Sequence, residues 1–226
     1  MKIQENISLK PFTTFGIDKK AKFFTRVSTI AELKSALIAA KEKQFPVLIL
    51  GGGSNILLTQ DVEGLVIKLE IKGIQVVQED ENHLWVEVGA GEVWHELVMH
   101  CIAQNWAGLE NLSLIPGTVG ASPMQNIGAY GVEIKDVFSS LQAMDRDTLE
   151  IHSFDGEACQ FGYRESIFKQ ALKNKYVITS VTFLLAKKPE FRLEYGAIQE
   201  VLQGKGVQHP SLREVSEAVI QIRQSK

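Results

Sequence analysis

Three consecutive glycines, at residues 51–53, follow the aliphatic run PVLIL (residues 46–50) and precede Ser54 and Asn55. Because glycine has no Cβ, the backbone N–H groups of such a loop can converge on the oxygens of a phosphate. The same glycines could form a plain turn, since glycine clusters commonly mark turns. The loop by itself therefore leaves two alternatives, a phosphate-binding loop and a turn.

The residues after the glycines exclude the two commonest phosphate loops. A P-loop places Lys and Ser or Thr after its second glycine, and no such pair follows Gly53. The dinucleotide-binding pattern G-x-G-x-x-G runs into a helix, whereas residues 54–60, SNILLTQ, resemble a turn and extended chain. A phosphate held here requires another fold.

A second glycine-rich stretch, GLENLSLIPGTVGASPMQNIGAYG, spans residues 108–131. We expect it to lack regular structure, and structureless segments of this length are usually functional. Two separate loops of backbone donors suit a diphosphate better than a single phosphate. The pattern therefore favours a ligand that contains a diphosphate.

Other reactive side chains favour structural roles. His95 and His100 are five residues apart, which places them about 140° apart around a helix, unlike the i, i+4 pair of a zinc helix. The carboxylates of residues 145–150, DRDTLE, fit a solvated hairpin tip. Cys101 and Cys159 lack the spacing of a metal or redox motif, so we predict two free thiols. No metal site is expected.

The first glycine loop ends a strand–helix–strand unit. FFTRV at residues 23–27 predicts a strand, and residues 29–44 predict a helix that begins with a capping box between Thr29 and Glu32. Residues 46–50 form the next predicted strand. The loop thus lies at the carboxyl end of a strand, where α/β folds usually bind ligands.

The pattern changes near residue 70, where we place a boundary between two subdomains. Residues 1–70 form a small α/β unit, and residues 71–226 form a more antiparallel α+β unit. The elements predicted in the second unit are a hairpin at 73–80 and 83–91, a helix at 92–105, and strands at 138–145, 149–154 and 176–186.

Charge and hydropathy limit the possible partners. The 226 residues carry a formal net charge of −3, and no basic block indicates a nucleic-acid or anionic-membrane surface. The N-terminal MKIQENISLK lacks the apolar region of a signal peptide. The longest apolar stretch, YVITSVTFLLA, is too short to span a bilayer. We therefore expect a soluble protein of the cytoplasm, with no nucleic-acid or membrane partner.

Three motifs, LILGGGSN, the whole of residues 108–131, and FGYRESIFK, resemble in order and spacing those of the flavoenzyme family UDP-N-acetylenolpyruvoylglucosamine reductase of bacterial peptidoglycan synthesis. The resemblance starts at TTFGI (residues 13–17) and runs to the last residue. It implies an α+β fold of the vanillyl-alcohol-oxidase type, with FAD held without a covalent bond between the two subdomains.

The resemblance also implies an activity. In this family a hydride passes from NADPH to FAD and then to the enolpyruvyl double bond of a UDP-sugar, which gives UDP-N-acetylmuramate. The family's two FAD loops match residues 51–55 and 116–131. The positions that the resemblance assigns to FAD are Gly51, Gly52, Gly53, Ser54, Asn55, Pro116, Gly117, Gly120, Ala121, Ser122, Asn126, Gly128 and Tyr130.

Hydride addition leaves negative charge beside a carboxylate, so the site needs fixed positive charge and an acid. Arg164 matches the family's active-site arginine, and its planar fork suits a carboxylate. From the residues alone, the alternative is a surface arginine paired with Glu165. The resemblance also places Tyr163, Tyr195 and Lys226 at the substrate, with Tyr195 on a loop that closes over the nucleotide and Lys226 at the diphosphate.

The chain departs from the family pattern after its last predicted helix. The family's Gly-Ser-Phe-Phe segment with its proton-donor serine, its third domain and its late glutamate do not follow. We expect a fragment or a natural short form that does not turn over the substrate by itself. The alternative is a flavin-binding module without chemistry, completed by another chain.

Two further expectations concern flavin attachment and association. No His or Cys lies where the resemblance marks a covalent flavin link, which argues against an oxidase with covalent FAD. The last helix carries Leu212, Val215, Val219 and Ile222 on one face. We expect that face to be exposed and prone to association. The sequence leaves the oligomeric state open.

Overall fold

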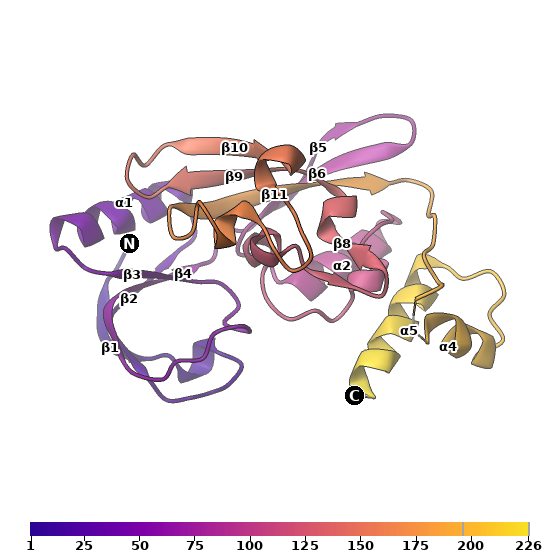
Figure 1. Cartoon of the computed structure of the whole chain (residues 1–226), viewed down its shortest axis with the longest axis horizontal. Helices are drawn as coiled ribbons and strands as arrows, with labels where there is room; N and C mark the ends of the chain where they lie inside the picture. Colours follow the sequence, from indigo (N-terminus) through magenta and orange to yellow (C-terminus); the bar gives the residue numbers. More distant parts are fainter. Residues whose placement is uncertain (196, 226) are drawn as a thin grey trace.

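The computed structural model describes residues 1–195 and 197–225, and its first unit is a four-stranded sheet (Figure 1). The strand order is β1-β2-β4-β3, in which β2, β4 and β3 are parallel and β1 is an antiparallel edge. The buried face of α1 packs against β2 and β4 in one apolar cluster. The bounds are β1 Gln4–Ser8, β2 Lys20–Val27, α1 Ile30–Glu42, β3 Val47–Leu50 and β4 Val62–Leu69.

The N-terminus of α1 differs slightly from the predicted capping box. Thr29 Oγ1 accepts a hydrogen bond from the Glu32 N–H (3.1 Å), as predicted. The Glu32 carboxylate reaches one residue further back, where it accepts from the N–H (2.8 Å) and the hydroxyl (2.9 Å) of Ser28. These bonds lower the pKa of Glu32. The side chains of Thr29 and Glu32 therefore both cap the N-terminus of α1.

The second unit is a five-stranded antiparallel sheet of order β10-β9-β11-β6-β5. Alternate side chains of β6 and β11 join α2 in the largest apolar core, where the rings of Trp94 and Phe183 pack in a T-shaped arrangement with their centroids 5.8 Å apart. The bounds are β5 Ile74–Glu79, β6 His83–Gly89, α2 Trp94–Ala103, β9 Phe138–Asp145, β10 Ile151–Asp155 and β11 Tyr176–Ala186.

All strands and helices predicted above are present, and the predicted hairpin is the pair β5 and β6. The elements without a sequence prediction include the edge strand β1, the central strand β4 and the short helix α4 (Ile198–Gly204). Pairing changes from parallel to antiparallel between β4 and β5. The division into two subdomains at residue 70 stays a prediction.

Residues 108–131 are more ordered than expected. They contain η2 (Glu110–Leu112), η3 (Val119–Ala121) and η4 (Pro123–Gln125), all 3₁₀ turns, and β7 (Gly128–Ala129), which pairs with β8 (Val132–Glu133). Buried Leu109, Leu112 and Val119 anchor the segment in the core. The remaining short helices are η1 Lys10–Phe12, η5 Ile134–Asp136, α3 Gly156–Cys159 and η6 Ile167–Lys169.

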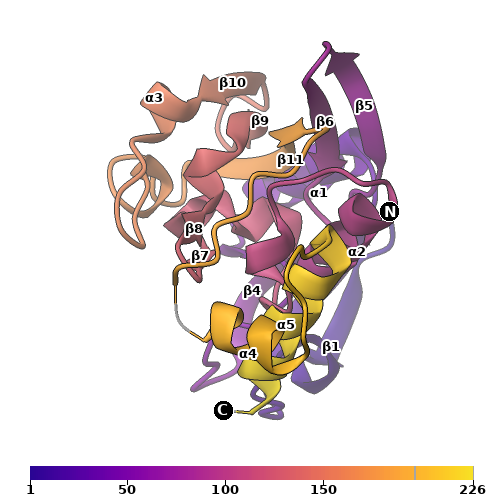
Figure 2. The same ribbon diagram turned by 90° about the vertical axis from the view of Figure 1, so that its right-hand side faces the viewer.

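The prediction of an exposed apolar face on the last helix is wrong. Helix α5 (Leu212–Gln224) starts with a capping box between Ser211 and Glu214. Its apolar residues pack against α4, η2 and Tyr130, and α4 lies beside α5 in Figure 2. The four residues of the predicted face are each at most 8% exposed: Leu212, Val215, Val219 and Ile222.

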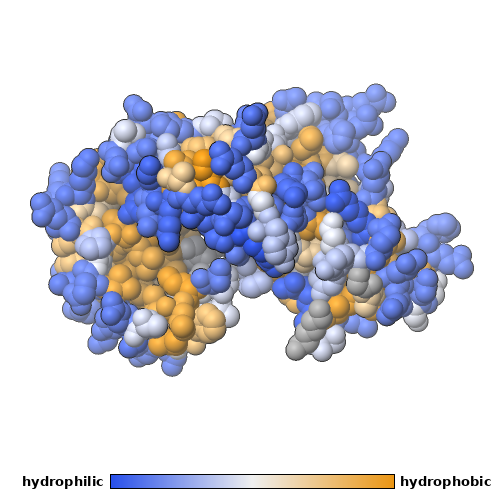
Figure 3. Space-filling view, in the orientation of Figure 1, coloured by the Kyte–Doolittle hydropathy of each residue, from blue (hydrophilic) through white to orange (hydrophobic). Residues whose placement is uncertain are grey.

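Apolar side chains gather instead over the first sheet, at the lower left of Figure 3. Among the large apolar residues, Phe15 and Leu57 of this unit are exposed by 62% and 58%. None of the helices in the described ranges combines the length and the hydropathy needed to cross a bilayer.

Candidate functional site

The first glycine loop follows β3, and its last glycine is required by packing. Gly53 has φ of +66°, and a Cβ there would lie 1.9 Å from the Phe12 carbonyl oxygen. The Gly53 carbonyl also accepts from the Thr14 N–H (3.0 Å). For Gly53 the glycine is therefore explained by the turn itself.

Gly51 and Gly52 instead face the second glycine-rich segment. A Cβ on Gly51 would lie 2.7 Å from Thr118 Oγ1, and a Cβ on Gly52 would lie 2.8 Å from the Gly117 Cα. At Gly52 only glycine permits this close approach of the two backbones, and at Gly51 a Cβ would press on the Thr118 side chain. The two loops predicted to share a diphosphate therefore touch each other.

Free backbone donors lie on both loops. The N–H groups of residues 52–55, and those of Gly117 and Thr118, donate to no other residue in the described ranges. Four other predicted cofactor positions offer no free N–H group. Pro116 has no N–H, and three N–H groups donate to carbonyl oxygens within the protein: Gly120 to Ala90, Ala121 to Thr118 and Ser122 to Val119. The donors available to a ligand are fewer than expected and lie where the loops meet.

Lys68 of β4 was missed by sequence reasoning. Its Nζ donates a hydrogen bond to the Gly51 carbonyl oxygen, and burial lowers its pKa. The available signal was a lysine inside the apolar strand sequence LVIKL. Lys68 fixes the first residue of the loop.

Two cavities flank the meeting point of the loops. One, of about 220 Å³, is lined by Gly51, β3, β11 and Arg146. The other, of about 340 Å³, is lined by Ser54, Asn55, Pro116 and Gly117. Both are also lined by Thr118, Ala121 and Met124. Two cavities that share a wall, with free backbone donors beside them, suit an elongated ligand that contains a diphosphate.

A third cavity, of about 600 Å³, brings together three of the four predicted substrate residues, Tyr163, Arg164 and Tyr195, and we call it the tyrosine cavity. Gly128 and Tyr130, which we had assigned to the cofactor, line this cavity and neither of the cavities beside the first glycine loop. Lys135, Arg192 and Arg223 line it too and were not predicted. Its predicted residues are Gly128, Tyr130, Tyr163, Arg164 and Tyr195.

Arg164 lies in a tight turn between Gly162 and Glu165, whose N–H and carbonyl groups bond each other at 3.1 and 3.3 Å. Arg164 is exposed and has φ of +55°, a left-handed backbone that is unusual for a residue with a side chain. Glu165 pairs with Lys169 (3.9 Å), and within the described ranges Arg164 has no ion pair with it. The alternative of an Arg164–Glu165 pair is therefore not what the structure shows.

Two buried side chains join this turn to the second glycine-rich segment. Asn126 Nδ2 donates to the Gly162 carbonyl (3.0 Å), while Asn126 Oδ1 accepts from the Lys135 N–H (3.1 Å). The Ser166 hydroxyl donates to the Met124 carbonyl (2.7 Å). The Asn126 side chain is thus engaged with protein groups and holds Arg164 at the cavity.

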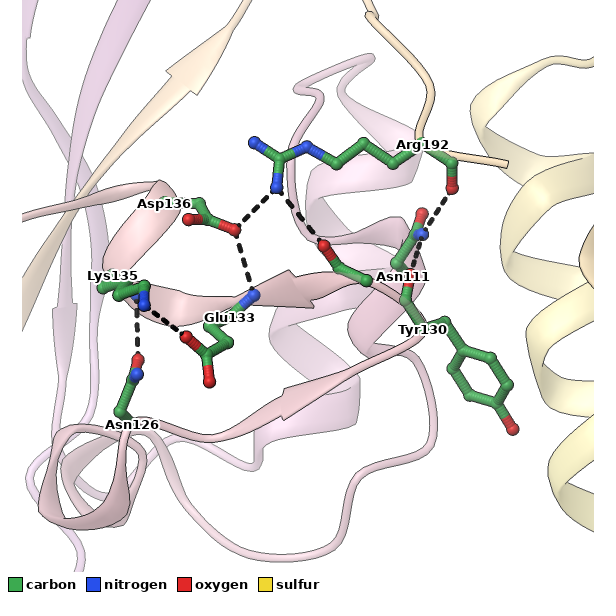
Figure 4. Close-up of polar contacts among 8 residues, drawn as sticks. Asn111, Asn126, Tyr130, Glu133, Lys135, Asp136 and Arg192 are labelled. Carbon is green, nitrogen blue, oxygen red and sulfur yellow. Dashed lines mark hydrogen bonds and ion pairs between the residues drawn. The ribbon is translucent and has the colours of Figure 1, made fainter. Parts of the chain in front are cut away.

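The charges of the tyrosine cavity are only partly paired. Lys135 pairs with Glu133 (2.6 Å), which raises the Lys135 pKa, and Arg192 pairs with Asp136 (2.8 Å) (Figure 4). Arg164 and Arg223 have no carboxylate partner in the part of the chain that the structure describes. The Arg223 Nε is buried there without a hydrogen-bond partner. The cavity therefore suits an anionic ligand.

The other candidate groups have structural surroundings. His95 Nδ1 accepts from the Leu114 N–H (3.0 Å), and burial lowers its pKa. Within residues 1–195 and 197–225, no three His, Cys, Asp or Glu side chains are grouped to hold a metal ion. Cys101 and Cys159 are free and buried, and burial raises the pKa of each thiol to about 12. Lys226 lies outside the described residues.

Comparison with known proteins identifies the family. The model of a family described as an FAD binding domain matches residues 21–152. Over 226 residues the chain is 51% identical to the UDP-N-acetylenolpyruvoylglucosamine reductase of Amoebophilus asiaticus, covering all of this chain and 67% of the relative. The reductase of the same name from Pseudomonas fluorescens is 47% identical over 226 residues, again over the whole chain and 66% of the relative. The chain thus spans about two thirds of the length of these relatives.

Solved structures show the same fold. The crystal structure of UDP-N-acetylenolpyruvylglucosamine reductase from Thermus caldophilus matches the whole chain and 71% of its own, with a TM-score of 0.73 and 24% identity. Cholesterol oxidase from Brevibacterium sterolicum matches 82% of this chain and 37% of its own, with a TM-score of 0.57 and 15% identity. The predicted α+β FAD-binding fold of the vanillyl-alcohol-oxidase type is confirmed. The chain belongs to the UDP-N-acetylenolpyruvoylglucosamine reductase family and contains an FAD-binding domain.

Proposed function

We propose that this chain is the FAD-binding part of a reductase that uses NADPH to convert UDP-N-acetylglucosamine enolpyruvate to UDP-N-acetylmuramate. The names of the relatives support the reaction, and the matched domain supports FAD. The single observation that carries the proposal is the tyrosine cavity, where Arg164 and Arg223 meet three tyrosines. A substrate with a carboxylate and a diphosphate supplies the anions that these arginines need.

The roles of the residues follow from their positions. The N–H groups of residues 52–55, Gly117 and Thr118 hold the diphosphate of FAD, which is bound without a covalent link. When bound, FAD supplies hydride transfer from NADPH to the enolpyruvyl double bond. Arg164 binds the substrate carboxylate, beside which negative charge develops.

The tyrosines form the walls of the substrate site. Tyr163 and Tyr195 are largely exposed at the cavity, by 86% and 62%, so their hydroxyls are available to the nucleotide and the sugar. Arg223 provides a second cation for the anionic substrate. In this role the protein acts in the cytoplasm in peptidoglycan synthesis, and so in cell-wall biogenesis, cell shape and cell division.

The test follows flavin absorbance. Acid precipitation of the FAD-loaded chain should release all flavin into the supernatant, and flavin kept in the pellet would refute the non-covalent proposal. Under anaerobic conditions NADPH should bleach the flavin faster than NADH does. Reoxidation by the enolpyruvyl substrate should be slow for this chain and fast for a full-length relative such as the reductase of Amoebophilus asiaticus. Flavin binding without bleaching by NADPH in either protein would favour the flavin-binding module.

A further inference from the structure

Residues 187–195, which we call the strap, run without regular structure from the end of β11 toward α4 (Figures 1 and 2). The strap begins at Lys187, whose N–H donates to the Asn82 carbonyl (2.8 Å). It ends at Tyr195, on the wall of the tyrosine cavity. A segment without a hydrogen-bond ladder has to be positioned by individual side chains.

Arg192 attaches the strap to the β7–β8 hairpin and the turn that follows it. One terminal nitrogen, Nη1, donates to Asp136 Oδ2 (2.8 Å), as Figure 4 shows, and also to the Gly131 carbonyl (3.3 Å). Its two hydrogens can serve both acceptors at once. Asp136 Oδ2 also accepts from the Glu133 N–H (3.1 Å), which fixes the carboxylate.

Asn111, which is 1% exposed, also connects the strap to the β7–β8 hairpin. Its Nδ2 donates to the Arg192 carbonyl (2.8 Å) and to the Tyr130 carbonyl (2.9 Å). The Tyr130 backbone is left-handed, with φ of +50°, a conformation that persists only when its surroundings fix it. The strap and the hairpin therefore share a buried anchor.

Tyr195 packs directly against the tip of the hairpin. Gly131 has φ of +77°, and a Cβ there would lie 3.1 Å from the Tyr195 Cβ. The position of Tyr195 thus depends on how closely the strap follows the hairpin, three residues after the Arg192 attachment. We infer that Arg192 is a positioning residue, which keeps Tyr195 on the wall of the tyrosine cavity through its contacts with Asp136 and Gly131.

This role differs from direct binding of the substrate. The charge of Arg192 is already paired with Asp136, whereas Arg164 and Arg223 have no such partner among the described residues. The side chain of Arg192 is 55% exposed and that of Asp136 is 24% exposed, so the pair is worth roughly 1 kcal/mol at most, or about fivefold in an equilibrium. That magnitude suits a residue that shifts a segment without determining the fold.

Chymotrypsin cleavage after Tyr195 tests the attachment without any ligand. Arg192→Met should speed this cleavage about fivefold, relative to cleavage after Phe15 in the same molecule, and Arg192→Lys should restore part of the protection by keeping the charge. Lys22→Met is the matched control, since Lys22 forms an ion pair with Glu63 (3.2 Å) on the first sheet and its side chain is 53% exposed. Equal cleavage rates in the wild type and Arg192→Met would overturn the inference.

A double-mutant cycle tests the consequence for the ligand, which rests on the proposed function. The probe is UDP-N-acetylglucosamine enolpyruvate, titrated into the FAD-loaded chain and followed by flavin absorbance. Arg192→Met should weaken binding about fivefold when Tyr195 is present and less than twofold in a Tyr195→Ala background. Equal losses in both backgrounds would show direct contact and overturn the positioning role. Absence of binding by the wild type would refute the proposed function, and the cleavage result would then decide the positioning of Tyr195.

Discussion

At the scale of single residues, left-handed backbone occurs at two residues that line the tyrosine cavity, Tyr130 and Arg164, and at Asn126, which anchors the Arg164 turn. Asn126, Tyr130 and Arg164 have φ of +43°, +50° and +55°. Such conformations cost free energy and persist where neighbouring contacts over-determine them. Here the contacts are hydrogen bonds from Asn111 and Asn126 to the carbonyls of Tyr130 and Gly162. The backbone therefore presents Arg164 to the cavity before any ligand is bound.

The first prediction concerns the chemistry of Arg164. In a full-length relative, the change that corresponds to Arg164→Lys should slow hydride transfer from flavin to substrate by about 10–100-fold, because an ammonium cannot copy the two parallel bonds of a guanidinium to a carboxylate. Flavin reduction by NADPH should change little. Stopped-flow absorbance separates the two half-reactions, and equal losses in both would mean that Arg164 supports the flavin or the fold.

The second prediction concerns Glu110, which is 5% exposed. Burial raises its pKa above the usual 4.5, although its carboxylate accepts from the Gly108 N–H (2.7 Å). Between the unfolded and the folded pKa the native state holds the extra proton, so the free energy of unfolding falls as pH rises through that window. Glu110→Gln, which stays neutral, should remove this fall. Urea unfolding from about pH 4.5 to pH 8 measures the free energy of unfolding of the wild type and of Glu110→Gln. Parallel pH profiles of the two proteins would contradict the prediction.

At the scale of elements, the glycine loops are set by the strands and turns beneath them. Gly53→Val is not a clean test of phosphate contact, because the Cβ of the introduced valine would clash with the Phe12 carbonyl oxygen. A loss of flavin binding in that variant would report disruption of the loop. Lys68 is a cleaner probe, because it reaches the loop from β4 and, among the described residues, its one side-chain hydrogen bond goes to the Gly51 carbonyl.

The third prediction is that Lys68→Met weakens FAD binding about tenfold, since a bond from a charged donor contributes roughly 1.5 kcal/mol or more. Because the bond is already formed without FAD, the melting temperature of the unliganded chain should fall as well, by roughly 2–5 °C. Lys22→Met, on the neighbouring strand β2, is the control and should leave FAD affinity unchanged. Isothermal titration calorimetry measures the affinity, and an unchanged value in Lys68→Met would exclude a positioning role for this lysine.

At the scale of the whole molecule, the two sheets meet at the second glycine-rich segment. The 220 Å³ cavity is lined by β3 of the first sheet and β11 of the second, together with Thr118 and Ala121. Arg146 joins the same units, because its guanidinium donates to the carbonyls of Val47 (3.3 Å) and Asn174 (3.0 Å). A cofactor bound at this junction contacts both sheets.

The fourth prediction follows from this position. FAD at 100 times its dissociation constant should stabilise the chain by about 2.7 kcal/mol, which raises the melting temperature by roughly 5–10 °C. Riboflavin, which lacks the diphosphate and adenosine, should give a much smaller shift at equal concentration. Differential scanning fluorimetry on tryptophan emission measures both. Equal shifts for the two ligands would argue against a diphosphate site at the glycine loops.

The sequence by itself determined the elements and the family. Helix and strand periodicity depend on neighbours within a few residues, so α1, α2, α5 and the hairpin of β5 and β6 could be predicted from local pattern. The two glycine-rich motifs and FGYRESIFK were sufficient to predict the FAD-binding fold, because the motifs are long and stand in the order and spacing of the family.

Only the tertiary structure decided which residues meet. Periodicity shows that α5 has an apolar face, but the packing of α4 and Tyr130 decides that this face is buried. Tyr130 lines the same cavity as Arg164, and Lys68 and Arg192 reach their sites from strands or segments far away in the chain. The physical reason is that convergence of distant segments depends on how whole elements pack, which no local spacing of residues encodes.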